Sequence, residues 1–361
     1  MIAKNQDLKY LIALSQIDGL GPIGLRKLID HFGNCERIYT ASFNELMEVG
    51  INQNVVQNIV CERNHFDPDE ELAKVEKYKV KCLTYLDKNY PKLLKEIYGF
   101  PPLIYYKGKL IDFDKPMVAV VGTRRPTSEG IRITENLVRK LVRSKITIVS
   151  GMAFGIDTVV HKTALENSGT TIAVLACGLD RIYPSSNYYL AKEIEKHGII
   201  ISEFSLGTLP IKENFPRRNR LISGLSLGTL VTEAPEKSGA LITAAYALEQ
   251  NREVFAIPYY PEYKLGKGCN FLIQKGAKLV TKAEDILEEL GLNYFKLPQK
   301  EITFENKTEE LIYNKLLQGN KHVEQLIKET NLTSQTLNST LTLMEVKGLV
   351  TRMNGGIYCI N

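Results

Sequence analysis

The sequence predicts an α/β protein built around a doubly wound, mostly parallel sheet, with a helical domain before it and a winged helix after it. From residue 117 to about 290, short runs of Val, Ile and Leu alternate with amphipathic helical stretches. Parallel strands covered on both faces require this alternation. Right-handed crossovers then give a Rossmann-like domain. A pattern of three helices and a hairpin ends the chain.

Residues 1–110 are predicted to form the helical domain. Apolar residues recur at helical spacing over residues 8–17, a glycine-rich turn follows at residues 20–24, and a second helix is expected over residues 25–33. A turn of this kind between two short helices is similar to a SAM or helix-hairpin-helix module. Its backbone N–H groups can meet a phosphate, and the alternative is a purely structural turn.

Residues 111–296 are predicted to form the Rossmann-like domain, in which buried strands and helices alternate. The expected strands lie at residues 117–122, 146–151, 171–176, 198–203, 228–234 and 253–258. The expected helices lie at about residues 129–143, 156–167, 187–197 and 240–250. The basic segment 212–220 is predicted to be a loop between the fourth and fifth of these strands.

Residues 297–306 are predicted to be a linker, and residues 307–361 a winged helix. Three helices are expected at residues 309–319, 323–331 and 334–348, and residues 349–353 and 357–360 flank the hairpin turn signal Asn354-Gly355-Gly356. Residues 302–361 carry six basic and six acidic side chains, whereas a major-groove reader normally needs more positive charge. We therefore expect a protein-contact or weak DNA-binding module rather than a transcription factor.

Composition excludes several classes of protein. The six cysteines are scattered without a C-x-x-C motif, which predicts buried thiols in a reducing compartment and no zinc or redox site. No run of 18 apolar residues and no signal peptide are present, so we expect a cytoplasmic protein without a membrane span. The net charge of +5 permits a polyanionic partner without requiring one.

Small and polar residues follow several of the predicted strands at the carboxyl edge of the sheet, where ligands of open α/β sheets bind. They include Gly122, Thr123, Gly151, Gly155, Ser238 and Gly239. Glycines let the backbone approach a ligand and helix N-termini favour anions, so an anion site is predicted there. Because neither G-x-G-x-x-G nor a P-loop is present, no nucleotide cofactor is expected.

Positive charge gathers beside this edge. Residues 121–145 carry seven basic and two acidic side chains, and the segment 212–220 carries a net charge of +3. Cations that hold phosphates, together with the aromatic face of Phe215, suit a single-stranded nucleic acid. The alternative is that Phe215 packs beneath the segment and its arginines form ion pairs. Arg139, Lys140 and Arg143 are expected to form a solvated helix face.

At these residues the chain resembles the DprA/Smf family of bacterial DNA-processing proteins of natural transformation. The matching stretches are residues 121–127 (VGTRRPT), 150–157 (SGMAFGID) with His161, 171–175 (TIAVL), 183–184 (YP), 202–203 (SE), 215–220 (FPRRNR), 238–244 (SGALITA), 270–273 (NFLI) and 276–277 (GA). The chain departs from the family pattern at Glu129, at Cys177 and at residues 259–263 (YYPEY).

The resemblance implies a dimeric, cytoplasmic protein that binds and protects incoming single-stranded DNA and helps to load RecA recombinase, with no cofactor. Of Arg217 and Arg218, one can point into the fold. The DNA-binding residues it implies, together with those chosen for charge and position, are Gly122, Thr123, Arg124, Arg125, Gly151, Gly155, Lys212, Phe215, Arg217, Arg218, Asn219, Ser238 and Gly239. The dimer interface is expected at Phe271, Leu272, Ile273 and Leu279.

Catalysis is the alternative. Asp157 and His161 lie at i and i+4 on one helix and could act as an acid/base pair, but capping of the helix explains them better. Glu203 and Glu233 end strands and could hold a sugar hydroxyl or a cation. The domain also resembles LOG-type nucleotide hydrolases, whose P-G-G-x-G-T-x-x-E motif supplies a catalytic Glu. Here residues 238–246 hold no carboxylate, so we expect no enzymatic activity.

Overall fold

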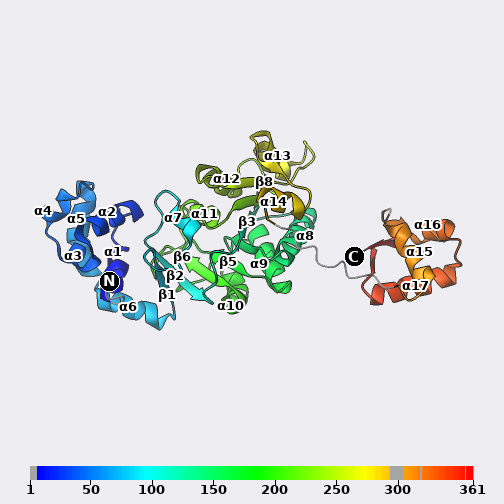
Figure 1. Ribbon diagram of the computed structural model, residues 1–361, viewed down its shortest axis with the longest axis horizontal. Coiled ribbons are helices and arrows are strands. Elements are labelled where there is room, and N and C mark those ends of the chain that lie inside the picture. Colours follow the sequence, from blue (N-terminus) through cyan, green and yellow to red (C-terminus); the bar gives the residue numbers. More distant parts are fainter. Residues whose placement is uncertain (1–5, 293–303, 318, 354, 361) are drawn as a thin grey trace. The chain divides into compact units, whose positions relative to one another are not determined.

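The computed structural model describes residues 6–292, 304–317, 319–353 and 355–360. It has the predicted architecture, a mixed α/β fold with a mostly parallel sheet and a C-terminal winged helix (Figure 1). The chain divides into two compact units, Met1–Phe295 and Lys296–Asn361. Most of the predicted linker at 297–306 lies outside the described residues.

Within the described residues, nine strands of the first unit form one sheet in the order β1-β2-β6-β5-β4-β3-β7-β8-β9. Their bounds are β1 (Lys81–Thr84), β2 (Leu103–Gly108), β3 (Met117–Val121), β4 (Thr147–Ser150), β5 (Thr171–Val174), β6 (Ile199–Ser202), β7 (Gly228–Val231), β8 (Glu253–Ala256) and β9 (Lys278–Leu279). The antiparallel pairings are β1–β2 and β2–β6. The sheet therefore takes its first two strands from within residues 1–110, which the sequence assigned to a helical domain.

The helical part of the N-terminal segment ends at Lys77, and the later helices of this unit cover the sheet. The helices are α1 (Gln6–Leu14), α2 (Pro22–Phe32), α3 (Cys35–Thr40), α4 (Phe43–Glu48), α5 (Gln53–Glu62), α6 (Pro68–Lys77), α7 (Lys92–Lys95), α8 (Ser128–Arg143), α9 (Ile156–Glu166), α10 (Tyr188–His197), α11 (Asn214–Gly224), α12 (Gly239–Glu249), α13 (Lys267–Gln274) and α14 (Ala283–Glu289). Short 3₁₀ turns lie at Arg63–His65, Ser185–Asn187 and Lys264–Gly266.

Alternate residues of the central strands enter two different cores, one on each face of the sheet. Ala119 and Val149 pack with α11, α12 and α13 on one face. Val118, Val120 and Ile148 pack with α8, α9 and α14 on the other. Burial on both faces explains why these strands read as continuous apolar runs.

The N-terminal helices extend the core at the β6–β2 end of the sheet. The apolar faces of α1 to α6 share one cluster with α10 and with Tyr105 of β2. A buried triad of hydroxyls joins these parts. Ser15, which follows α1, lies 3.3 Å from the Tyr105 hydroxyl and 3.1 Å from Ser205, measured between oxygen atoms. The helical segment and the Rossmann-like domain are therefore one packed unit.

The predicted loop at residues 212–220 is wrong beyond Glu213, because helix α11 begins at Asn214. Leu221, Ile222 and Leu225 recur at helical spacing and are buried against the sheet. Pro216 stands in the first turn, where a proline removes no intrahelical hydrogen bond. The three arginines of this segment thus stand on a helix, and Lys212 lies in the turn before it.

The second unit confirms the predicted winged helix. Its elements are α15 (Lys307–Leu316), β10 (Lys321–His322), α16 (Val323–Thr330), α17 (Ser334–Val346), β11 (Val350–Met353) and β12 (Ile357–Ile360). The sequence missed the two-residue strand β10, which pairs with β12. The turn residue Asn354 lies outside the described residues.

Burial of the cysteines is only partly as predicted. Cys35, Cys177 and Cys269 are buried, whereas Cys82 and Cys359 are half-buried and Cys61 is exposed. Across the described ranges, no three His, Cys, Asp or Glu side chains cluster as metal ligands. In the same ranges, no helix has the length and apolar character needed to cross a membrane.

Removing the hydroxyl of the buried triad should loosen the attachment of the N-terminal helices. Tyr105→Phe is expected to lower the free energy of unfolding by about 1 kcal/mol, because a buried hydrogen-bonded group is lost while Ser15 and Ser205 can still bond each other. Denaturant unfolding measures the change. Tyr98→Phe, at an 87% exposed tyrosine, is the control and should change nothing. Equal stability of Tyr105→Phe and the wild type would contradict this role of the triad.

Candidate nucleic-acid-binding site

A pocket of about 650 Å³ lies where the strand order of the sheet reverses. Strands β4, β5 and β6 follow one another on one side of β3, and β7 pairs with β3 on the other side. Ligands of open α/β sheets bind outside the carboxyl ends of the strands at this switch point. The pocket is lined there by the residues after β3, the residues after β7 and the first two turns of α11.

The turn after β3 is fixed by close backbone packing. A side chain at Gly122 would lie 2.6 Å from Ile156, and one at Gly155 would lie 2.4 Å from the Thr123 carbonyl oxygen. Gly155 also has a φ of 75°, which favours glycine. Gly155 therefore lets the loop before α9 press against the turn, and this packing leaves Arg124 exposed at the pocket.

Glu233 holds this turn from the neighbouring strand. The buried carboxylate accepts hydrogen bonds from the Thr127 backbone N–H (2.9 Å), the Thr127 hydroxyl (2.8 Å) and the Tyr263 hydroxyl (2.6 Å). Its backbone oxygen accepts one from the Thr123 N–H at 2.7 Å. The Glu203 side chain is also buried, and its Oε2 pairs with Arg220. Both carboxylates are thus engaged by groups of the protein.

Lys212 and Phe215 supply a cation and an aromatic face to the pocket. The Phe215 ring is half-buried, with the Tyr183 ring centroid 5.7 Å from its own and the Arg124 guanidinium 5.1 Å from its centroid. Among the described residues, no carboxylate forms an ion pair with Arg124 or Lys212. The pocket wall thus combines an aromatic surface with positive charge that the protein does not neutralise.

Of the two neighbouring arginines, Arg218 is the one that points into the fold, so it is not a free cation at the pocket. The side chain is 4% exposed and donates to the backbone oxygens of Gly151 and Val174 and to the Asn219 side chain. Burial lowers the pKa of Arg218 to about 10, so the guanidinium stays charged near neutral pH. A side chain at Gly151 would lie 2.7 Å from this guanidinium, so Gly151 makes room for it.

Asp157 and His161 are both buried and do not bond each other. The Asp157 carboxylate accepts from the Ala153 N–H at 3.2 Å, near the start of α9. His161 Nδ1 lies 2.8 Å from the Thr171 hydroxyl, which itself donates to the Ile148 carbonyl, so Nδ1 carries the proton and donates. Asp157 thus bonds the loop before α9 and His161 bonds β5, so the contacts of both groups lie within the fold.

The structure gathers most of the predicted DNA-binding residues at one pocket. Lys237 also lines it, and its charge beside Ser238 and Gly239 was a signal that the sequence offered. The predicted residues that line the pocket are Gly122, Thr123, Arg124, Lys212, Phe215, Arg218, Asn219, Ser238 and Gly239. The ones outside its lining are Arg125, Gly151, Gly155 and Arg217. Arg217 instead borders a second cavity with Gly21, Pro22 and Ile23 of the turn before α2.

Comparison with protein families agrees with this architecture. The model of DNA recombination-mediator protein A matches residues 81–291, more than half of the chain. The chain belongs to this family. The model of the DprA winged helix domain matches residues 305–356.

Members of the DprA/Smf family are similar to the chain over most of its length. Protein Smf of Synechocystis is 43% identical over 80% of this chain and 73% of its own length. DNA processing protein DprA of Streptococcus pneumoniae is 44% identical over 62% of this chain and 79% of its own. The X-ray structure of the pneumococcal DprA superimposes with a TM-score of 0.69 at 38% identity, covering 78% of this chain and 97% of that one.

A solved DprA from Helicobacter pylori is relevant to the pocket, because the structure of that protein gave insight into its single-stranded DNA binding mode. It matches with a TM-score of 0.53 and 33% identity over 59% of this chain and 95% of its own. The DprA/Smf family to which this chain belongs is thus one of DNA-processing proteins.

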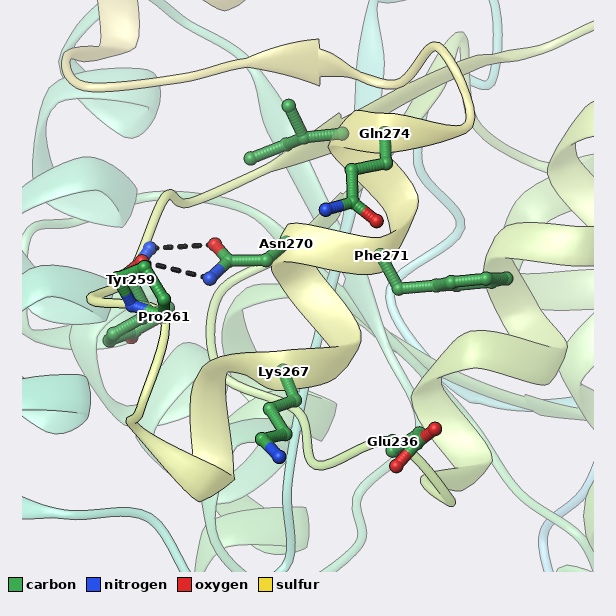
Figure 2. A pocket seen from close by; sticks show the side chains of 8 residues that line it. Glu236, Tyr259, Pro261, Lys267, Asn270, Phe271 and Gln274 are labelled. Atoms are coloured by element: carbon green, nitrogen blue, oxygen red, sulfur yellow. Dashed lines mark hydrogen bonds between the residues drawn. The ribbon is translucent and has the colours of Figure 1, made fainter.

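The expected dimer surface lies on α13 and β9, at the β9 edge of the sheet. Phe271 and Leu279 are exposed, whereas Leu272 is buried in the core. Figure 2 shows Phe271 and Asn270 on different sides of α13, with Asn270 bonded to the backbone of Tyr259 (2.9 and 2.8 Å). A cavity of about 490 Å³ adjoins this surface, and the half-buried Ile273 contributes to it.

The buried His161 predicts a pH-dependent loss of stability. Burial lowers its pKa to about 3, whereas the unfolded chain binds the proton near the ordinary value of about 6.5. Stability is therefore complete above about pH 6.5 and falls below it, by up to about 1.4 kcal/mol per pH unit for one proton. His161→Asn keeps a donor for Thr171 and should flatten this slope, as measured by denaturant unfolding between about pH 7 and about pH 4.

The control is His65→Asn, at an exposed histidine of the N-terminal segment, which should keep the wild-type pH profile. If His161→Asn and the wild type lost stability in parallel below about pH 6.5, the neutral buried imidazole would be the wrong assignment.

Proposed function

We propose that this chain binds single-stranded DNA in the pocket at the strand switch point. The supporting observation is the joint placement of Arg124, Lys212 and the Phe215 ring around one cavity, with both cations free of ion pairs among the described residues. Cations beside an aromatic face hold phosphates and stack a base without requiring a particular sequence. The Helicobacter pylori relative, named for a single-stranded DNA binding mode, supports this choice of ligand.

The proposed action is binding without catalysis. The carboxylates nearest to the pocket, Asp157 and Glu233, are buried and accept hydrogen bonds from the protein itself. Both carboxylates are engaged by groups of the protein, so neither is open to a substrate as a general acid or base. This arrangement favours DNA binding over the nucleotide-hydrolase alternative.

The proposed role is that of a cytoplasmic recombination mediator, which protects incoming DNA during natural transformation and helps to load RecA. The family description, DNA recombination-mediator protein A, supports it. We further propose that two copies pair through Phe271, Ile273 and Leu279 and so place two pockets on one strand. Exposed apolar side chains beside the edge strand β9 support this pairing.

Substitution of Arg124 tests the pocket. Arg124→Ala should weaken binding of an oligothymidylate and lower the salt dependence of log K by about 0.7, the loss of one phosphate contact. Phe215→Ala should cost about 1–3 kcal/mol of binding free energy and leave the salt dependence unchanged, because stacking releases no counterion. Fluorescence anisotropy over a range of salt concentrations measures both quantities.

Arg139→Ala is the control, at an exposed arginine on α8 that does not line the pocket. If Arg124→Ala binds the oligonucleotide with wild-type affinity at low salt, the pocket is not the DNA-binding site. The same variants test the larger role, because Arg124→Ala should fail to speed RecA filament formation on single strands. Nucleotide turnover by the wild type without preference for single strands would favour the hydrolase alternative.

Introducing a charge at the expected interface tests the proposed dimer. Phe271→Glu and Leu279→Glu should each convert the dimer to a monomer in sedimentation, because a charge at a packed apolar contact is costly to bury. Leu86→Glu is the control, at a leucine that is 61% exposed and lies outside α13 and β9. A dimer that persists in both variants would place the interface elsewhere.

A further inference from the structure

Four large aromatic side chains stand exposed beside the DNA pocket, and the functions proposed above do not use them. They are Phe154 (47% exposed), Tyr183 (40%), Tyr188 (49%) and Tyr189 (82%). Single exposed aromatic residues are ordinary on a protein surface, but a contiguous group marks a binding surface. We call these four residues the aromatic row.

The row meets the pocket at Tyr183. Tyr183 lines the pocket, and its ring pairs with that of Phe215 at 5.7 Å between centroids. Phe154 follows Ala153, which also lines the pocket. The 3₁₀ turn Ser185–Asn187 then leads directly from Tyr183 to the start of α10.

Hydrogen bonds hold the row in place. The buried Asn187 donates to the Met152 carbonyl at 3.0 Å and to the Thr158 hydroxyl at 2.9 Å, which ties the start of α10 to the loop that carries Phe154. Next to Asn187, Tyr188 and Tyr189 form an edge-to-face pair with centroids 5.6 Å apart. Segments tied together in this way lose little conformational entropy when a ligand binds.

Beyond the pocket, the charged side chains of Arg181 and of α10 form ion pairs within the protein. Arg181 pairs with Asp180, Lys192 pairs with Glu195, and Lys196 pairs with Glu193. The Lys192 ammonium also lies 5.7 Å from the Tyr188 ring centroid. The row therefore offers ring faces and little free positive charge, so it suits bases better than phosphates.

We propose that the aromatic row is a stacking track for the bases of a single strand that leaves the pocket past Tyr183 toward Tyr189. This inference rests on the proposed function, because the pocket anchors the strand by its phosphates. The track adds length to the bound segment. It binds bases without sequence preference, since every base has a face that stacks on an aromatic ring.

The chain contains no tryptophan, so Tyr189→Trp introduces a single fluorophore at the far end of the row. Titration with oligothymidylates of about 4 and about 16 nucleotides covers the range of single-strand site sizes. The long oligonucleotide should quench the emission by stacking on the indole, and the short one, held by the pocket, should not. Tyr78→Trp is the control, at an exposed tyrosine after α6, and should not respond.

Tyr189→Ala and Tyr188→Ala give a second readout. Each should weaken binding of the long oligonucleotide roughly 5- to 10-fold, the low end of base stacking, without changing the salt dependence or the binding of the short one. If Tyr189→Trp stays bright while anisotropy shows saturation by the long oligonucleotide, the track is wrong and the pocket stands. If neither oligonucleotide binds the wild type, the proposed function itself fails.

Discussion

One buried guanidinium holds together the segments that form the pocket. Arg218 of α11 donates to the backbone at Gly151, which follows β4, and at Val174, which ends β5. It thereby fixes α11 against the carboxyl edge of the sheet and sets where Lys212 and Phe215 stand. A buried charge is costly unless its hydrogen bonds are satisfied. Here the carbonyl oxygens at the strand ends satisfy it, so the fold and the binding site share one interaction.

The basic residues therefore have two different roles, one structural and one at the pocket surface. Arg218 and Arg220 are bound inside the protein, where they organise α11 and its surroundings. Arg124 and Lys212 remain at the surface of the pocket, where a ligand can meet them. Net charge over a segment does not reveal this division, because buried and exposed cations count equally in it.

The order of strands and helices could be predicted from the sequence because burial on both faces leaves continuous apolar runs, as in residues 117–122. The pocket could be located because β3 and β7 end in small and polar residues at one edge. The loop assigned to residues 212–220 failed because Leu221 and Ile222 show their helical burial only against the sheet. The burial of Arg218 and Leu272 depends on the direction in which each side chain points. The sequence does not indicate that direction, because each residue has a neighbour of similar chemistry that points the other way.

The aromatic row could not be predicted from the sequence, because its residues come from separate segments of the chain. Its residues fall on three elements, the loop before α9, the turn before α10 and α10 itself, and the resemblance marks only the stretches that hold Phe154 and Tyr183. Asn187 brings the three together through two hydrogen bonds. If bases stack there, binding has two separable parts: a salt-dependent one at Arg124 and Lys212, and a salt-independent one along the row. Lengthening the oligonucleotide should then raise the affinity more steeply than it raises the salt dependence.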